Sequence, residues 1–157
     1  MKTSVDVKLK EYDLKLLEKD YDRISIFVED SKKLDRICKR VNKLTKGTIL
    51  KAVSSKEFEE KSCGDILTVS FPSGLQAKHL DIVKWSKSGK PIDAKKAGVN
   101  LAKKSKNSEI LVCAGIQKFS EELIKGYLLR QYEFSDYKAG GDKGMGAATL
   151  MSKHTKE

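Results

Sequence analysis

The chain has 157 residues, 39% of them hydrophobic, which is about the size of one domain and enough to bury a core. Its 32 Lys and Arg exceed its 22 Asp and Glu, giving a formal net charge of +10. No apolar run approaches the roughly 20 residues of a membrane span, and the opening MKTSVDVKLK lacks the apolar segment of a secretory signal. The sequence therefore predicts a protein without a membrane partner, located in the cytoplasm.

Two strands are expected near the amino terminus. Apolar residues alternate with polar ones at Val5, Val7 and Leu9, and again at Ile24, Ile26 and Val28 after the charged stretch 18–23. A period of two places alternate side chains on one face of a strand. Both segments are therefore predicted to be half-buried strands.

The hydrophobic period changes to that of a helix after Ser31. Apolar residues then recur at helical spacing, at Leu34, Ile37, Cys38, Val41 and Leu44. Asp30 or Ser31 could cap the start of this helix, and Gly47 follows its end. A second, shorter helix is predicted over residues 49–58.

Residues 64–87 predict two strands joined by a turn. The first apolar run contains Ile66, Leu67, Val69 and Phe71, and the second contains Leu80, Ile82, Val83 and Trp85. Pro72 and Gly74 lie between them. Pro sets the φ needed early in a turn, and Gly accepts the positive φ needed after it, so the chain is expected to reverse here.

The remaining elements complete an α/β pattern. Pro91 to Lys104 is a predicted helix with proline in its first turn, and Glu109 to Ala114 is a predicted buried strand. Ser120 opens the last helix, and a last strand is expected over residues 147–153. Helices should cover both faces of a mixed sheet. The Gly-rich segment 138–146 predicts a loose connection before the last strand.

Several of these segments carry a family resemblance. They include the turn Pro72–Ala77, which reads Pro-x-Gly-Leu-x-Ala, the small pair Ala97 and Gly98 in a helix, and Tyr132–Lys138, which reads Tyr-x-Phe-x-x-Tyr-Lys. The chain resembles the amino-terminal domain of the leucyl (cytosol) aminopeptidase family from about Val5 to Lys153. Two departures are Lys61-Ser-Cys-Gly64 before the first of the paired strands and Val83-Lys84-Trp85 in the second.

The resemblance implies a macro-domain-like fold over residues 1–153, with 154–157 beginning a linker to a catalytic domain that this chain lacks. In the family, that other domain holds two divalent metal ions, zinc or manganese, and removes amino-terminal residues from peptides. The chain alone is thus expected to contain no catalytic, cofactor-binding or metal-binding residue. The resembled domain packs on the outside of a hexamer and limits access to the interior. Aromatic residues that could serve either such contacts or core packing are Trp85, Tyr132, Phe134 and Tyr137.

The residue types that usually perform catalysis are sparse. His79 and His154 have no second ligand or nucleophile at a recognisable spacing, and both are expected at the surface. Cys38 and Cys113 lie in apolar segments, where a thiol acts as a small hydrophobic group. Cys63 could be exposed and reactive, although inertness is the simpler reading. The four glycines between 140 and 146 follow a helix, so they do not form a phosphate-binding loop.

A second hypothesis is a stand-alone basic module that binds nucleic acid weakly. Basic residues cluster along two predicted helices, at Lys95, Lys96, Lys103, Lys104 and Lys106, and at Lys32, Lys33, Arg36, Lys39, Arg40 and Lys43. No aromatic residues interleave with them as a stacking surface requires, so solvated lysine faces are the alternative explanation. A third hypothesis, ADP-ribose binding, follows from the macro-like fold, but the Asn-rich and Gly-rich loops it requires are not visible.

Overall fold

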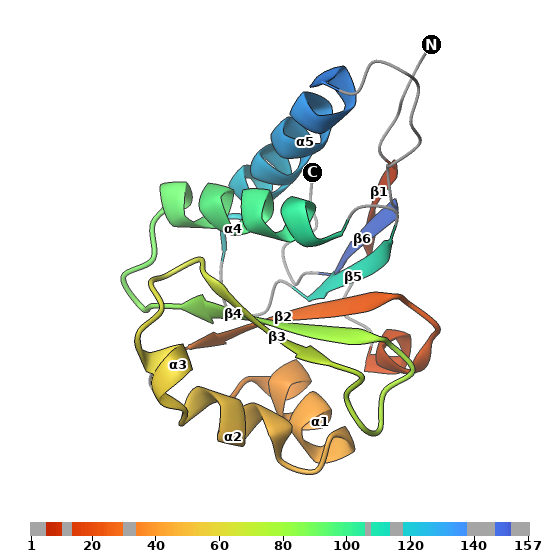
Figure 1. Cartoon of the computed structure of the whole chain (residues 1–157), viewed down its shortest axis with the longest axis vertical. Coiled ribbons are helices and arrows are strands. Elements are labelled where there is room, and N and C mark those ends of the chain that lie inside the picture. The colour runs from red at the N-terminus through yellow and green to blue at the C-terminus, as the bar shows by residue number, and fades with distance from the viewer. Residues whose placement is uncertain are drawn as a thin grey trace.

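The computed structural model describes residues 6–10, 14–29, 34–105, 108–113, 118–137 and 147–151. The elements follow in the order β1 (Asp6–Lys10), the 3₁₀ helix η1 (Leu14–Glu18), β2 (Arg23–Glu29), α1 (Arg36–Leu44), α2 (Thr48–Val53), α3 (Lys56–Glu59), β3 (Ile66–Ser70), β4 (His79–Trp85), α4 (Pro91–Lys104), β5 (Glu109–Cys113), α5 (Ser120–Tyr137) and β6 (Ala147–Met151) (Figure 1).

The strands form one mixed sheet in the order β1-β6-β5-β2-β4-β3. Every neighbouring pair is parallel except β3 and β4, which run antiparallel. Strands β1 and β3 are therefore the two edges, while β2 lies inside the sheet between β4 and β5. The predicted α/β class with a mixed sheet is confirmed.

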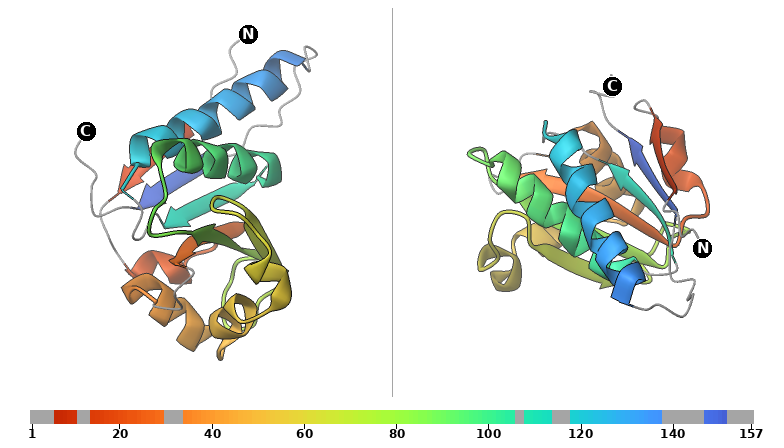
Figure 2. Two further views of the ribbon diagram at one scale, coloured as in Figure 1. Left: turned by 90° about the vertical axis from the view of Figure 1, so that its left-hand side faces the viewer. Right: turned by 90° about the horizontal axis from the view of Figure 1, so that it is seen from above.

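Helices lie on both sides of this sheet, so the molecule has three layers (Figure 2). Helices α4 and α5 cover one face, and α1, α2, α3 and η1 cover the other. Alternate side chains of β2 separate into the two cores, with Ile24 and Ile26 on the α1 side and Phe27 on the α4 side. The predicted helices on both faces are confirmed.

Close packing of α4 against α5 depends on two glycines. A Cβ on Gly98 would stand 2.8 Å from the backbone nitrogen of Tyr127 and would overlap the carbonyl of Leu123. A Cβ on Gly126 would overlap the carbonyl of Lys95. The absence of both side chains lets the two helix backbones touch, which fixes α4 and the residues it carries above the sheet.

The predicted strand, turn and strand are confirmed as β3 and β4, with one correction. Phe71 does not belong to the first strand: β3 ends at Ser70, and Phe71 is 76% exposed with a φ of 51°. It begins the turn, where Phe71 N donates to Lys78 O at 2.6 Å. Gly74 has a φ of 83°, and its backbone lies against the carbonyl of Leu44 at the end of α1, so the turn is anchored to that helix.

Two helix predictions also need correction. The first helix begins at Arg36, and its cap is Asp35, whose carboxylate accepts from Cys38 N at 2.8 Å. The predicted helix over 49–58 is two helices, α2 and α3. Ser55 separates them, because its Oγ accepts from Phe58 N at 3.1 Å and donates to Ala52 O at 2.6 Å. Helix α4 has the predicted bounds, Pro91–Lys104.

The prediction that β2 is half-buried was wrong. Arg23 through Val28 are all buried, because helices cover both faces of this inner strand. The short helix η1 was not predicted. Strand β5 is confirmed to Cys113 and β6 over Ala147–Met151, while Val5, Ala114 and the Gly-rich segment 138–146 lie outside the described residues. The domain limits 1–153 and 154–157 stay a prediction.

Candidate functional site

A surface cleft with basic walls lies between α4 and the segment that leads into β3. Its volume is about 320 Å³, and it is lined by Lys61, Asp65, Ile66, Asn100, Lys103 and Lys104. We call these six residues the basic cleft. Lys61 and Asp65 come from the loop between α3 and β3, whereas the last three belong to the final two turns of α4.

Hydrogen bonds hold the walls of the basic cleft together. The Asn100 Nδ2 donates to the carbonyl of Gly64 at 3.0 Å, which joins α4 to the loop. Asp65 accepts from Ser62 N at 2.8 Å and forms an ion pair with Lys96 at 3.1 Å. The cleft is therefore shaped by contacts within the protein and does not depend on a ligand to form.

The charges around Asp65 are mainly positive. Partial burial alone would raise the pKa of this carboxyl. The hydrogen bond from Ser62 N–H and the positive charges of Lys96 and Lys61 outweigh burial, and its pKa lies below the ordinary value. Within the part of the chain that the structure describes, Lys61, Lys103 and Lys104 have no acidic partner. Three ammonium groups thus remain to meet an anion.

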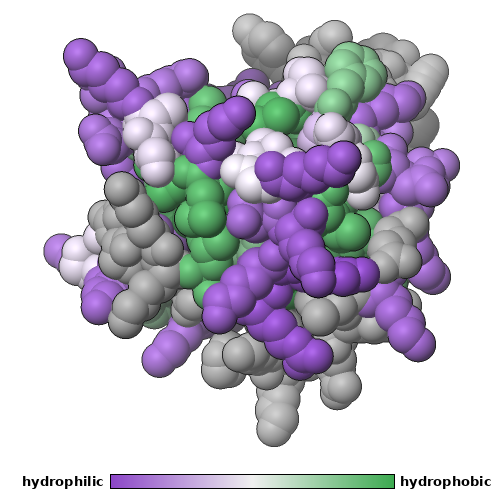
Figure 3. All heavy atoms as spheres, turned by 90° about the horizontal axis from the view of Figure 1, so that it is seen from below, coloured by the Kyte–Doolittle hydropathy of each residue, from purple (hydrophilic) through white to green (hydrophobic). Residues whose placement is uncertain are grey.

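The two predicted basic clusters lie on opposite faces of the sheet. Helix α1 carries Arg36, Lys39 and Lys43 on one face, and α4 carries Lys103 and Lys104 on the other. Figure 3 shows the α1 and α2 side, where hydrophilic side chains are spread between smaller hydrophobic areas. Lys32, Lys33 and Lys106 lie outside the described residues. The structure does not join the two clusters into one track.

A second polar group is buried beneath the α4 side of the sheet. Asp81 of β4 is fully buried and receives hydrogen bonds from Arg23 Nε and Nη2, both at 3.0 Å. Ser25 Oγ and Thr68 Oγ1 also donate to its carboxylate, at 3.2 and 2.7 Å. All four side chains are engaged with one another and shielded from water, so they stabilise the sheet and are not placed to meet a substrate.

The structure places both described cysteines of the apolar segments in the core. Burial raises the pKa of the Cys113 thiol, and burial together with the nearby Asp35 carboxylate raises that of Cys38. Cys38 Sγ donates to the carbonyl of Phe27 at 3.3 Å. Cys63 is half-buried, and its sulfur accepts from Ser86 N at 3.4 Å. The prediction of structural thiols at Cys38 and Cys113 is confirmed.

The remaining predicted residues do not form a site. His79 is half-buried, with its Nδ1 3.5 Å from Ser70 Oγ, and His154 lies outside the described residues. Trp85 is only 4% exposed and packs against Phe27 at 5.8 Å between ring centroids, so it belongs to the core and is not an exposed anchor. The side chains of Tyr132, Phe134 and Tyr137 are outside the description.

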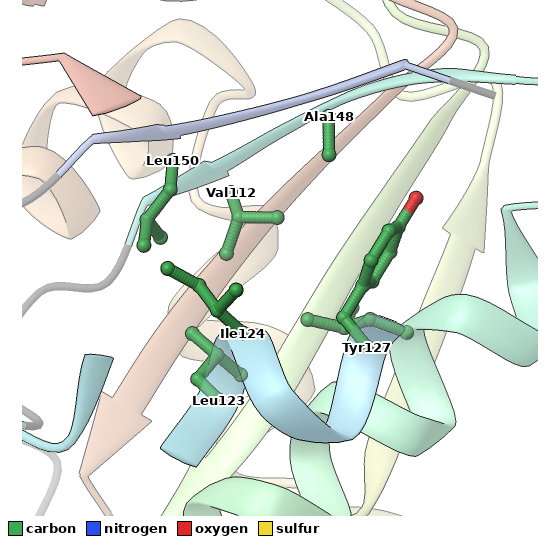
Figure 4. A pocket seen from close by; sticks show the side chains of 7 residues that line it. Val112, Leu123, Ile124, Tyr127, Ala148 and Leu150 are labelled. Atoms are coloured by element: carbon green, nitrogen blue, oxygen red, sulfur yellow. The ribbon is translucent and has the colours of Figure 1, made fainter. Parts of the chain in front are cut away.

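A second hollow is small and apolar. It has a volume of about 20 Å³ between α5 and strands β5 and β6. Its walls include Leu123, Ile124 and Tyr127 of α5, which point toward Val112 and Leu150 in Figure 4. The hydroxyl of Tyr127 lies 3.1 Å from Ser105 Oγ. The hollow is too small for an organic ligand and is a packing gap in the α5 core.

Two searches of the described residues gave no site. They contain no group of three or more His, Cys, Asp or Glu residues placed to hold a metal ion. None of the helices within the described ranges is long and apolar enough to cross a bilayer.

Sequence reasoning found the lysines of α4 but missed what they face. Asn100 and Asp65 gave no pattern of their own, because their partners Gly64 and Lys96 lie far away in the chain. The buried pair Arg23 and Asp81 was also missed. Charged residues within otherwise apolar strands were the available indication, since such residues are buried only when they are paired.

No family model matches the chain. It is 31% identical over 140 residues to the probable cytosol aminopeptidase of Dinoroseobacter shibae, covering 89% of this chain and 29% of that protein. It is 27% identical over 147 residues to the probable cytosol aminopeptidase of Cereibacter sphaeroides, covering 94% of this chain and 30% of that protein. The chain therefore spans less than a third of the curated relatives it matches.

Among solved structures, the macrodomain of Mycobacterium tuberculosis DarG superposes with a TM-score of 0.67 at 12% identity, over 94% of this chain and 98% of that one. A Trypanosoma brucei macrodomain in complex with ADP-ribose gives a TM-score of 0.66 at 10% identity, over 94% of this chain and 64% of that one. These likenesses confirm the macro-like fold. Together with the aminopeptidase relatives, they confirm the resemblance to the amino-terminal domain of that family.

Proposed function

We propose that this chain acts as the non-catalytic amino-terminal domain of a metal-dependent leucyl aminopeptidase, a hydrolase that removes amino-terminal residues from peptides. The observation that carries the proposal is the extent of the match to the Dinoroseobacter shibae protein, which takes in 89% of this chain but only 29% of that protein. In this proposal the other part of the protein supplies the catalytic residues and holds two divalent metal ions, zinc or manganese. The protein acts in the cytoplasm.

The role proposed for this domain is packing within a hexamer and control of substrate access. Apolar side chains exposed on its surface support a contact role, because they gain most from being covered. The largest exposed fractions are those of Phe71 at 76% and Ile92 at 65%, and Leu128 and Leu129 lie next to each other on α5. Ile92 lies in the first turn of α4.

The first experiment measures the mass of the protein in source cells with antiserum raised against this chain. A band much heavier than 17.6 kDa is expected. The purified 157-residue chain should release nothing from a leucine anilide, with or without zinc or manganese. A band at 17.6 kDa, or metal-dependent release by the pure chain, would overturn the proposal.

The alternative is a free-standing module that binds nucleic acid weakly through its charge. The net charge of +10 supports it, whereas the placement of the basic helices on opposite faces weakens it. If it holds, affinity for duplex DNA falls steeply between low and physiological salt. An affinity that does not change with salt argues against this module.

Binding of ADP-ribose is not part of the proposal, although the Trypanosoma brucei macrodomain was solved with that ligand. A likeness at 10% identity extends to the fold and not to the binding loops. Calorimetry with ADP-ribose is expected to give no heat, and a saturable signal would revive that function.

A further inference from the structure

We propose that the basic cleft binds the polyphosphate group of a compact ligand. This inference is independent of the aminopeptidase assignment, because the cleft lies wholly within the chain. The charge balance is the first support. Lys61, Lys103 and Lys104 have no acidic partner among the described residues, while the single acid of the cleft, Asp65, is already paired with Lys96.

The kind of cation favours phosphate as the ligand group. The cleft contains Lys and no Arg. An ammonium group binds phosphate as a point charge from any direction, whereas Arg is preferred where a planar carboxylate is held by two parallel hydrogen bonds. Three ammonium groups converging on one hollow match a ligand that carries several phosphate charges in a short length.

The size and rigidity of the cleft favour a small ligand. Its volume of about 320 Å³ is at the lower end of the roughly 300–1,000 Å³ of small-molecule sites. The hydrogen bond from Asn100 to Gly64 fixes the distance between α4 and the opposing loop. Binding then requires little reorganisation of the protein, which lowers its entropic cost.

Two simpler explanations cover only part of the observation. Lys103 and Lys104 lie in the last turn of α4, where positive charge stabilises the helix dipole. Lys61 has no such role, because it follows α3 and reaches the same hollow from another element. A nucleic acid needs a continuous basic track, and the α1 cluster lies on the opposite face.

The test is calorimetry of the full chain with inorganic tripolyphosphate and, separately, with ATP. Saturable binding of tripolyphosphate is expected. Equal affinity for the two probes identifies the phosphate chain as the recognised group, and tighter binding of ATP adds a contact to the nucleoside. Each outcome supports the proposal and distinguishes the source of the ligand.

Variants then locate the site. Lys103→Ala with Lys104→Ala should lower the affinity about tenfold or more, since ~1.4 kcal/mol of lost binding corresponds to a factor of ten. Lys61→Ala, outside the helix, should lower it several-fold. The matched control is Lys39→Ala with Lys43→Ala on α1, which removes the same charge from an exposed helix on the other face. It should change the affinity less than about twofold, because screening removes most of the effect of exposed charges more than ~10 Å away.

Asp65→Asn gives a prediction of the opposite sign. It removes the acid from the cleft while an amide oxygen can still accept from Ser62 N. The affinity for tripolyphosphate should therefore rise. The proposal is overturned if the unchanged chain gives no heat with either probe, if the α1 control loses as much affinity as the α4 variant, or if an oligonucleotide binds while tripolyphosphate does not. None of these results bears on the mass or peptidase activity that test the proposed function.

Discussion

Arg23 of β2 and Asp81 of β4 form a buried two-point ion pair between adjacent parallel strands. Two guanidinium nitrogens donate to the two carboxylate oxygens at 3.0 Å, and the exposed fractions of the side chains are 10% and 0%. Thr68 of the neighbouring edge strand completes the contact. The carboxylate therefore links three consecutive strands, β2, β4 and β3, at the same level of the sheet.

Breaking this pair from one side should be costly. Asp81→Ala leaves the Arg23 guanidinium buried without its counter-charge, and removing one partner of a buried pair typically costs ~3–5 kcal/mol. Urea denaturation should show a correspondingly lower free energy of unfolding. Thr68→Val is the matched control, because it removes one neutral hydroxyl from the same carboxylate and should cost only about 1 kcal/mol. Equal losses for the two variants would contradict the ion-pair account.

Alanine at Gly98 or Gly126 should destabilise the protein. In an ordinary helix this change gains ~1 kcal/mol of helix propensity. Here the new Cβ would overlap the backbone of the opposing helix, and such overpacking typically costs ~1–3 kcal/mol. Thermal unfolding of each variant checks the sign. Lys125→Ala on the exposed side of α5 is the control and should stay within ~0.5 kcal/mol of the original chain. A higher melting temperature for Gly98→Ala would show that the two helices can move apart freely.

The fold was predictable where one local pattern decides the structure. Pro91 in a first helical turn and the apolar period after it were enough for the bounds of α4. Local patterns gave less where partners from elsewhere in the chain decide. The alternation of β2 predicted one buried face, but its second face is covered by α4, which begins more than sixty residues later. The break at Ser55 depends on a side chain that caps α3, and Ser is common in both helices and caps.

The candidate site was less predictable than the fold. Lysine clusters are visible in the sequence, but a cluster on a solvated helix and a cluster in a cleft look the same there. What separates them is the opposing wall, and Asn100 meets Gly64 across 36 residues of chain. Long-range pairs of this kind leave no spacing pattern, so Arg23 and Asp81 were also beyond reach.

Alkaline pH should weaken the fold through the two buried thiols. Burial holds the pKa of Cys113, and burial with the Asp35 charge that of Cys38, above the ordinary value of 9.0. Below that pH the thiols are neutral in both states and their contribution to stability is complete. As the pH rises above it, the unfolded chain loses protons that the folded chain retains, so the free energy of unfolding falls.

Denaturation at pH 7, 8.5 and 10 checks this direction. A Cys38→Ala, Cys113→Ala variant controls for lysine and tyrosine ionisation, and its stability should fall less between pH 8.5 and 10 than that of the original chain. In the native state at pH 8, a thiol reagent should label Cys63 well before the two buried cysteines. Identical pH slopes for the two proteins, or rapid labelling of Cys113, would contradict the burial of these thiols.

Replacing Phe71 by asparagine should stabilise the isolated chain. Phe71 has a φ of 51° and is 76% exposed, so its ring gains little from burial while its backbone occupies the left-handed region. That region costs most residues ~1–2 kcal/mol, and Asn tolerates it better. A gain of about 0.5–1 kcal/mol is expected by urea denaturation. Phe71→Ala is the control, since it removes the ring but keeps the backbone cost, and it should give no gain. A loss of stability in both variants would mean that the contact of the ring with His79, at 6.0 Å between centroids, matters more than the backbone.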